Sequence, residues 1–214
     1  MSILIKKTYN DDKNDYKNYK YEKSLYLDLT TNLLTGGIFG SSEPLKENEI
    51  NNKNPKMNYY KDKNNDYFII RGSDDIEDLI TDSTLILQDS IKEIIKNPAI
   101  DNKEKQLIKF INQNRRKDKG LILTGHSLGS HHANKIHEKF PKSRLISFGH
   151  AGLYISPEAE AVYSFSKDPF YRPTNKKNHI ILNKNPSSFF HNPFNEFHSI
   201  QNFINKDNFK KKNL

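Results

Sequence analysis

The apolar residues of this chain fall into short continuous runs that alternate with segments in which apolar residues recur every three or four positions. A continuous run bounded by turn residues is typical of a buried strand, whereas the wider spacing indicates a helix with one apolar face. Strands are predicted at Tyr67–Ile70, Thr84–Gln88, Leu121–Thr124, Arg144–Phe148, Ala161–Phe165 and His179–Leu182. Helices are predicted at 91–98, 101–116, 128–140 and 197–204. This alternation indicates an α/β fold with a mainly parallel central sheet and helices on both faces.

The helix over 101–116 has recognisable ends. Asp101 and Glu104 stand in the D-x-x-E spacing of a capping arrangement, in which side chains accept hydrogen bonds from free amides of the first turn. Arg115 and Arg116 stand at the other end, where positive charge interacts favourably with the helix dipole. The spacing therefore predicts that this helix starts at Asp101.

The first third of the chain has a different character. The sequence SLYLDLTTNLL, at 24–34, precedes two glycines and predicts a helix that is stopped by glycine. Residues 41–65 are rich in asparagine and charge, with little periodicity, and are interpreted as an irregular surface connection and not as a domain boundary. We expect one domain over 1–214, with a polar part rich in asparagine, lysine and tyrosine at 1–63 and a basic tail at 207–214.

The charge balance favours anionic partners such as phospholipid headgroups or nucleic acid. The formal net charge is +8 at pH 7. The basic residues are scattered and do not form a stripe, apart from the tail lysines at 210–212, so a nucleic-acid partner is not expected. A peripheral contact with an anionic membrane stays open.

The sequence lacks cysteine, which excludes disulfides, thiol catalysis and thiolate metal sites. The apolar run within MSILIKKTYNDDK, at 1–13, is far shorter than the core of a signal peptide and is followed by charge. No stretch approaches the ~18 uninterrupted apolar residues of a membrane span. We therefore expect a cytoplasmic, otherwise intracellular or virion location.

The strongest chemical signal is the G-x-S-x-G sequence Gly125-His126-Ser127-Leu128-Gly129, between a predicted strand and a predicted helix. In a nucleophile elbow, the turn at the serine is too sharp to leave space for Cβ atoms on either side. The strained serine then projects its hydroxyl above the edge of the sheet. The amide of Leu128 points at the same place and can bind a developing oxyanion. The alternative is a glycine-bounded turn with an inert serine.

The segment LTGHSLGS closely resembles the serine segment of the class 3 lipases, a family with the α/β-hydrolase fold. A second segment, IRGSDDIEDLITD, resembles the family's oxyanion strand and loop, in which the residue after Arg-Gly is the second oxyanion donor. The resemblance implies an oxyanion hole formed by the amides of Ser73 and Leu128; alternatively, Ser73 merely caps a following helix. Asp82 matches an acidic position of the family and is expected to be structural. The segment SFGHAG, at 147–152, resembles the family's turn after the next strand.

A serine hydroxyl is a weak nucleophile until a histidine accepts its proton, and a carboxylate must orient that histidine. In α/β-hydrolases the chain order is serine, acid, histidine, so both partners must follow Ser127. Asp168 follows a predicted strand in KDPF, which resembles the family's Asp-Pro segment, and His198 begins HSIQNFI, which resembles the family's terminal histidine segment. The resemblance thus implies a triad of Ser127, Asp168 and His198. The alternatives are His191 for the base, and Glu158, Glu160, Glu196 or Asp207 for the acid.

The resemblance implies a lipase or esterase that hydrolyses carboxylic esters of lipids through an acyl-serine intermediate, as triacylglycerol lipases do, without a metal or organic cofactor. Members of the family usually carry an apolar lid after the oxyanion strand. Here the predicted strand and helix fill residues 82–101, so we expect an open, esterase-like site. The basic surface favours a phospholipase on anionic membranes as one alternative. A catalytically inactive binding or structural protein with the hydrolase fold is another.

Overall fold

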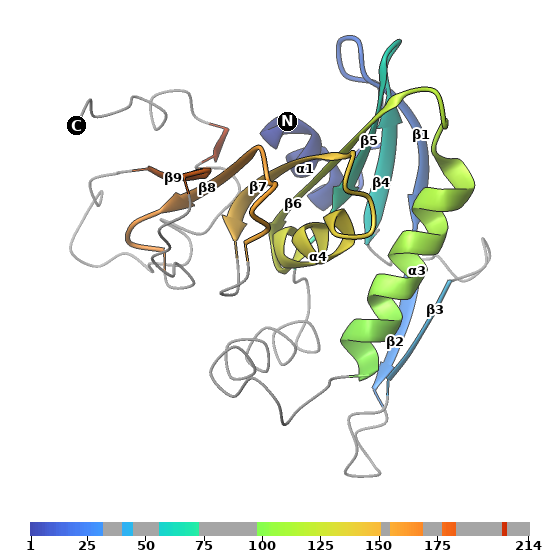
Figure 1. The fold of residues 1–214 in the computed structure, drawn as a ribbon. Coiled ribbons are helices and arrows are strands. Elements are labelled where there is room, and N and C mark those ends of the chain that lie inside the picture. The colour runs from blue at the N-terminus through green and yellow to red at the C-terminus, as the bar shows by residue number, and fades with distance from the viewer. Residues whose placement is uncertain are drawn as a thin grey trace.

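A seven-stranded sheet runs through the centre of the protein (Figure 1). The computed structural model describes residues 1–31, 40–44, 56–72, 98–150, 155–168, 177–182 and 203–204. Across the sheet the strands are β1 (Lys20–Leu25), β4 (Met57–Lys61), β5 (Asn65–Ile70), β6 (Gly120–Ser127), β7 (Arg144–His150), β8 (Ala161–Phe165) and β9 (His179–Leu182). A separate two-stranded sheet joins β2 (Leu27–Thr31) to β3 (Gly40–Pro44).

Most of the central sheet is parallel. Strands β1 and β4 pair antiparallel, as do β4 and β5, whereas every neighbouring pair from β5 to β9 is parallel. Ile70 of β5 is in register with Gly125 of β6, and Ser127 of β6 with His150 of β7. The carboxyl ends of these strands therefore lie side by side, and we call this side of the sheet the carboxyl edge. The predicted mainly parallel α/β sheet is confirmed.

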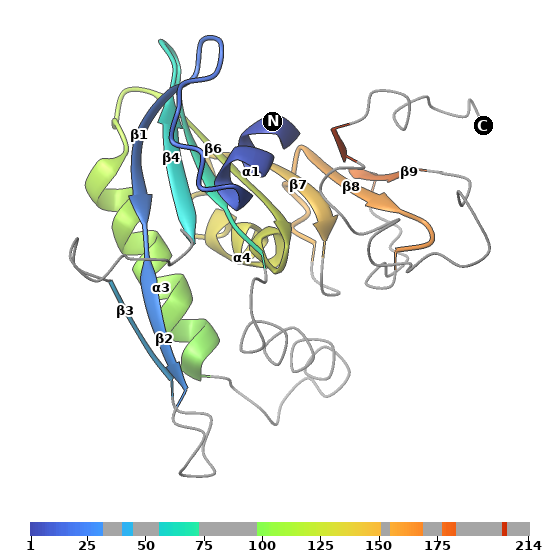
Figure 2. The same ribbon diagram turned by 180° about the vertical axis from the view of Figure 1, so that it is seen from behind.

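Alternate residues of the central strands face two separate cores. In β5, Phe68 contributes to one core and Ile69 to the other, and both are fully buried. The first core is closed by α3 (Pro98–Asn114) and α4 (Leu128–His137), and the second by α1 (Ser2–Tyr9). Figures 1 and 2 view the sheet from opposite sides and show α3 and α4 on one face and α1 on the other. Helices on both faces, as predicted, are confirmed.

The predicted strands agree with the observed ones wherever the structure describes the chain. The segments predicted at Tyr67–Ile70, Leu121–Thr124, Arg144–Phe148, Ala161–Phe165 and His179–Leu182 are contained in β5 to β9. The predicted strand at Thr84–Gln88 lies outside the described residues, as do 91–97 and 197–202 of two predicted helices.

The predicted helix at 24–34 is wrong over the part that the structure describes. Residues up to Leu25 belong to β1, and Leu27 opens β2. Leu25, Leu27 and Leu29 stand two apart, which is the period of a strand, whereas Leu25, Leu29 and Leu33 fit the spacing of a helix. The apolar pattern is therefore ambiguous here. Pairing of Leu25 with Met57 of β4 decides it in favour of the strand.

The interpretation of residues 41–65 as an irregular connection is also wrong in part, because this segment contains most of β3 and all of β4. β4 lies between β1 and β5 and is hydrogen-bonded to both. Met57 and Tyr59 join the core under α3, while Tyr60 joins the core under α1. Asparagine and lysine dominate the composition, but burial of these three side chains on both faces outweighs that composition.

Helix α3 starts at Pro98 and not at Asp101. Proline suits the first turn of a helix, because its missing N–H has no partner within the helix at that position. Asp101 consequently lies inside the helix, and the predicted start is wrong by three residues. Among the described residues, neither α3 nor any other helix is long and apolar enough to span a membrane.

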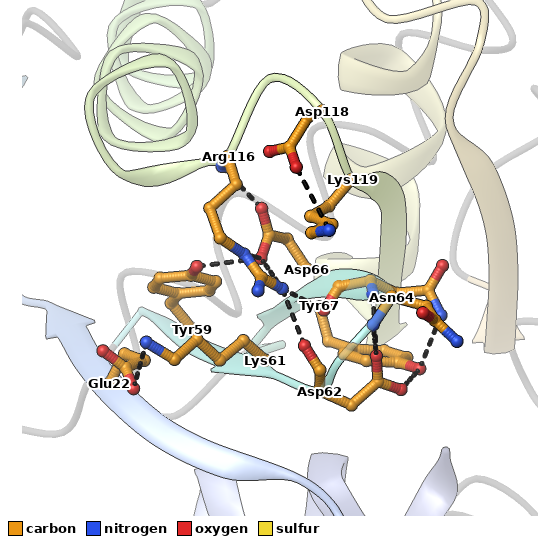
Figure 3. Close-up of polar contacts among 11 residues, drawn as sticks. Glu22, Tyr59, Lys61, Asp62, Asn64, Asp66, Tyr67, Arg116, Asp118 and Lys119 are labelled. Atoms are coloured by element: carbon orange, nitrogen blue, oxygen red, sulfur yellow. Dashed lines mark hydrogen bonds and ion pairs between the residues drawn. The ribbon is translucent and has the colours of Figure 1, made fainter.

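A buried ion pair joins Asp66 of β5 to Arg116, in the segment between α3 and β6, at the end of the strands opposite the carboxyl edge (Figure 3). The carboxylate of Asp66, only 1% exposed, accepts hydrogen bonds from the backbone N–H and the Nε of Arg116 at 2.6 and 2.8 Å. It also accepts one from the Tyr59 hydroxyl at 2.9 Å. Burial, and then the carboxylate itself, raise the pKa of Tyr59, so the hydroxyl stays a donor. Arg116 Nη2 further donates to the carbonyl oxygens of Asp62 and Asn65.

Candidate active site

Strand β6 and helix α4 meet at Ser127 without an intervening loop. The strand ends at Ser127 and the helix begins at Leu128. Ser127 has φ 57° and ψ −131°, a left-handed backbone conformation that costs a non-glycine residue on the order of 1–3 kcal/mol. The pairing of β6 with β7 also shifts register between His126 and Ser127. The strained turn that the G-x-S-x-G sequence predicts is thus present at the carboxyl edge.

Both glycines of the motif stand where a side chain has no space. A Cβ atom on Gly125 would overlap the carbonyl group of Gly129. A Cβ atom on Gly129 would overlap the carbonyl oxygen of Ile70 and lie 2.7 Å from the carbonyl carbon of Arg71. These neighbours are backbone atoms of packed elements and cannot move aside as a flexible side chain would. The glycines therefore allow α4 to approach the end of β5. The prediction that no space remains for Cβ atoms on either side of the serine is confirmed.

Two backbone segments converge on Ser127. Leu128 is the first residue of α4, and the first amides of a helix have no partner within the helix. On the other side, a Cβ atom on Gly72 would lie 2.9 Å from Ser127 Cβ and 2.6 Å from the His126 carbonyl oxygen. The chain therefore passes directly beside Ser127 just before Ser73, the predicted second donor. Ser73 itself, like Asp82, lies outside the described residues.

The side chain of Tyr9, the last residue of α1, also lies close to Ser127. Its hydroxyl accepts a hydrogen bond from the Gly72 N–H at 3.0 Å and lies 3.0 Å from His126 Nδ1. The Arg71 guanidinium lies 4.8 Å from the centre of the Tyr9 ring and donates to the carbonyl oxygens of Thr8 and Tyr9 at 3.3 and 2.9 Å. Sequence reasoning missed Tyr9, because Gly72 and His126 are 63 and 117 positions away and no local pattern marks the contact.

The ring of His126 is enclosed next to the serine. Tyr9 and Phe203 approach it edge to face, with ring centroids 5.6 and 5.8 Å away. Gly149 has φ 52°, and a Cβ atom on it would lie 3.1 Å from the His126 ring. It belongs to β7, which continues to His150, so the turn predicted to start at Phe148-Gly149 is wrong over these residues. His126 is held by aromatic contacts beside Ser127 and is buried.

Asp168 lies in a tight turn after β8. Its backbone N–H donates to the Phe165 carbonyl oxygen at 3.0 Å, and the residue is 5% exposed, as is Ser127. β8 is separated from β6 by one strand, β7. Neighbouring strands lie about 4.8 Å apart, so the ends of β6 and β8 are roughly 10 Å apart across the sheet. Ser127 and Asp168 therefore belong to the same edge of the sheet.

Two of the alternative acids lie at the other end of the strands. Glu160 immediately precedes β8, and its carboxylate accepts hydrogen bonds from Arg144, the first residue of β7, at 2.6 and 2.8 Å. Glu158 precedes β8 as well and is exposed. Their position separates both from Ser127 by the length of the parallel strands. Glu196 and Asp207 lie outside the described residues.

The C-terminal part of the chain returns to the carboxyl edge at Phe203. This ring is fully buried and packs against His126, Phe148 and Phe165, with centroid distances of 5.8, 5.7 and 4.9 Å. It therefore touches the residue before Ser127 and the strand that leads to Asp168. The predicted base His198 and its alternative His191 lie outside the described residues.

The histidines of α4 and of the end of β7 are buried and serve as packing groups. Burial lowers the pKa of His131 to about 3, so the ring is neutral. His132 is fully buried, with Nδ1 3.3 Å from a carboxylate oxygen of Glu104. Nδ1 of His150 lies 2.9 Å from the Ser130 hydroxyl. The rings of His131 and His150 stack between α4 and β7, whereas His132 faces Glu104 of α3.

No family model, curated protein or solved structure gives a significant match to this chain. The resemblance to class 3 lipases therefore rests on the motifs quoted above.

Proposed function

We propose that the protein is a serine hydrolase of the α/β-hydrolase type, similar to class 3 lipases, that cleaves carboxylic esters of lipids. The observation that carries the proposal is the strained Ser127, held at the carboxyl edge of a parallel sheet between a strand and the first turn of a helix. A serine without a chemical role in a simple turn would not require a strained backbone, which costs the fold free energy. In a nucleophile elbow the same conformation presents the hydroxyl to the substrate.

The proposed reaction has two steps. Ser127 attacks the ester carbonyl while His198 takes its proton, and the negative oxygen is held by the amides of Leu128 and Ser73. Collapse of this intermediate breaks the bond to the alcohol, which leaves with the proton from His198, and an acyl-serine remains. Water, activated by His198, then releases the fatty acid and restores Ser127. Asp168 holds His198 in the required tautomer and stabilises its positive charge.

The position of Phe203 favours His198 over His191 as the base. His198 stands five positions before Phe203, and an extended chain of this length reaches at most about 18 Å. Phe203 packs against His126, the neighbour of Ser127, so the proposed role of His198 needs only a short connection. His191 is twelve residues away from Phe203, a reach of about 43 Å, so the same contact constrains it much less. The gap of roughly 10 Å between the ends of β6 and β8 suits an imidazole between Ser127 and Asp168.

A fluorophosphonate probe tests the proposal, because it labels only an activated serine. We expect the wild-type protein to be labelled and to hydrolyse short-chain esters. Ser127→Ala should abolish labelling and lower turnover by at least about 10⁴-fold. Ser166→Ala is the matched control, since Ser166 is an exposed serine in the turn after β8 and should retain both properties. An unlabelled wild-type protein would instead favour the inactive binding or structural protein.

The basic surface supports one variant of this function, a phospholipase. A net charge of +8 attracts the protein to anionic headgroups and raises the local substrate concentration. Fatty-acid release from vesicles of anionic phospholipid should then exceed release from a neutral glyceride and should fall as salt is added. Equal rates at low and high salt would leave the neutral ester as the preferred substrate class.

A further inference from the structure

The Tyr9 hydroxyl joins two backbone segments that border Ser127 from different sides. Gly72 stands just past the end of β5, and His126 immediately precedes the serine in β6. The hydroxyl lies 3.0 Å from both the Gly72 nitrogen and His126 Nδ1. These two segments come from neighbouring strands, so their relative position sets the shape of the place where an ester carbonyl would sit.

The Gly72 amide fixes the direction of one of the two hydrogen bonds. The amide can only donate, so the Tyr9 oxygen accepts from it. The direction of the second hydrogen bond, between the hydroxyl and His126 Nδ1, follows from the tautomer of the imidazole ring. One hydroxyl thus ties the exit of β5 to the residue before the nucleophile.

Two sets of contacts hold Tyr9 in place: the packing of α1 on the core and the contacts of Arg71. Leu4 and Ile5 of α1 are buried in the core under the helix. Arg71 donates to the two carbonyl oxygens at the end of α1 and lies under the Tyr9 ring. A cation at the C-terminus of a helix is favoured by the helix dipole, and one over an aromatic face by the ring quadrupole. These contacts therefore restrain the position of the Tyr9 hydroxyl.

We propose that Tyr9 is a positioning residue that holds Gly72, the residue before the proposed second oxyanion donor, at its distance from Ser127. This inference rests on the proposed function. Ser73 follows Gly72 directly, so a shift of Gly72 moves the Ser73 amide relative to the serine hydroxyl. Removing one oxyanion donor costs about 10²-fold or more in kcat, and a misplacement of about 1 Å is of similar consequence. A partial loss of alignment should lower kcat by about 10-fold.

The substitution Tyr9→Phe tests this role, because it removes the hydroxyl and keeps the ring over Arg71 and beside His126. Tyr67→Phe is the matched control. The Tyr67 hydroxyl also bridges two groups, accepting from Asn65 Nδ2 at 3.3 Å and donating to Asp62 Oδ2 at 2.6 Å, but at the opposite end of β5. Both variants are titrated with the fluorophosphonate probe, so that kcat is expressed per active serine and a misfolded fraction does not count.

We expect Tyr9→Phe to lower kcat about 10-fold with little change in KM. The inhibition constant of a trifluoromethyl ketone, which forms an oxyanion on the serine, should rise by a similar factor. Tyr67→Phe should lower the melting temperature and leave kcat per active serine and the inhibition constant at wild-type values. A change below threefold in both kcat and the inhibition constant of Tyr9→Phe would overturn the inference.

The two proposals fail in different ways. If the wild-type chain is not labelled by the probe, the hydrolase function itself is wrong. If the wild type is labelled and hydrolyses esters, but Tyr9→Phe matches it per active serine, then only the positioning role of Tyr9 is wrong.

Discussion

Replacing Asp66 by asparagine should be among the most destabilising single changes at the amino end of the sheet. The carboxylate is 1% exposed and accepts hydrogen bonds from Arg116 and Tyr59, two of them within 2.8 Å. Asparagine keeps one acceptor oxygen but directs an NH₂ group at donors. Removing the negative charge also leaves the Arg116 guanidinium, whose side chain is 30% exposed, without its ion-pair partner.

The magnitude follows from burial of the pair. Breaking a buried ion pair by removing one partner costs about 3–5 kcal/mol. Arg116 is partly solvated, which moderates the loss, so we expect Asp66→Asn to lower the free energy of unfolding by about 3 kcal/mol. For a domain of this size, 1 kcal/mol corresponds to about 2–4 °C in melting temperature. The expected decrease is therefore roughly 6–12 °C.

Urea unfolding followed by circular dichroism measures this change, and the chain offers a close control. Glu160 also binds an arginine through two hydrogen bonds, at 2.6 and 2.8 Å, but its side chain is 44% exposed. Exposed pairs contribute about 0–1 kcal/mol, so Glu160→Gln should cost less than about 1 kcal/mol. The reasoning is refuted if Asp66→Asn costs no more than Glu160→Gln, because the two pairs differ mainly in burial.

Two further predictions concern the site and the pH dependence. Asp168→Asn should lower kcat by about 10³–10⁴-fold, because the catalytic histidine loses the group that orients it. The melting temperature, which reports on folding, should stay within a few degrees of the wild-type value. A variant with wild-type kcat would exclude Asp168 as the acid. Burial raises the pKa of Glu104 from 4.5 to about 7. Between these two pH values the carboxyl group is protonated in the folded protein and ionised in the unfolded chain. The free energy of unfolding therefore falls as pH rises through this range. Glu104→Gln should therefore unfold like the wild type at pH 4, below both pKa values, and be more stable by up to about 3 kcal/mol at pH 8. A difference that does not change with pH would contradict this assignment.

The part of the site that could be predicted is encoded locally. In the segment from Gly125 to Gly129, a strand, a turn and a helix meet within five residues, and the glycines report directly on the space around Ser127. Asp168 was proposed as the acid for a similar reason, since it follows a short predicted strand and stands in a segment that resembles the Asp-Pro segment of class 3 lipases. The parallel strands were predicted from their short apolar runs. In β5 and β6 these runs are buried on both faces, whereas β9 at the end of the sheet exposes Ile181.

The parts that could not be predicted depend on contacts between distant segments. Tyr9 stands in a polar, lysine-rich start of the chain, and its role becomes visible only when α1 is placed over β5 and β6. β4 has a loop-like composition, and its partners β1 and β5 make it a strand. The leucines at 25–33 fit two periods, so pairing with β4 and not their spacing decides the structure.

Strand β5 connects the buried ion pair at one end of the sheet to the candidate active site at the other. Asp66, near its start, is fixed by a buried ion pair, and Gly72, just beyond its end, touches Ser127 and Tyr9. At about 3.3 Å per residue, these positions are roughly 20 Å apart. Groups so far apart contribute to stability almost independently. The ion pair at the amino end can therefore stabilise the sheet that holds the strained Ser127. Residues at the carboxyl edge can then serve the proposed chemistry with little effect on the stability of the amino end.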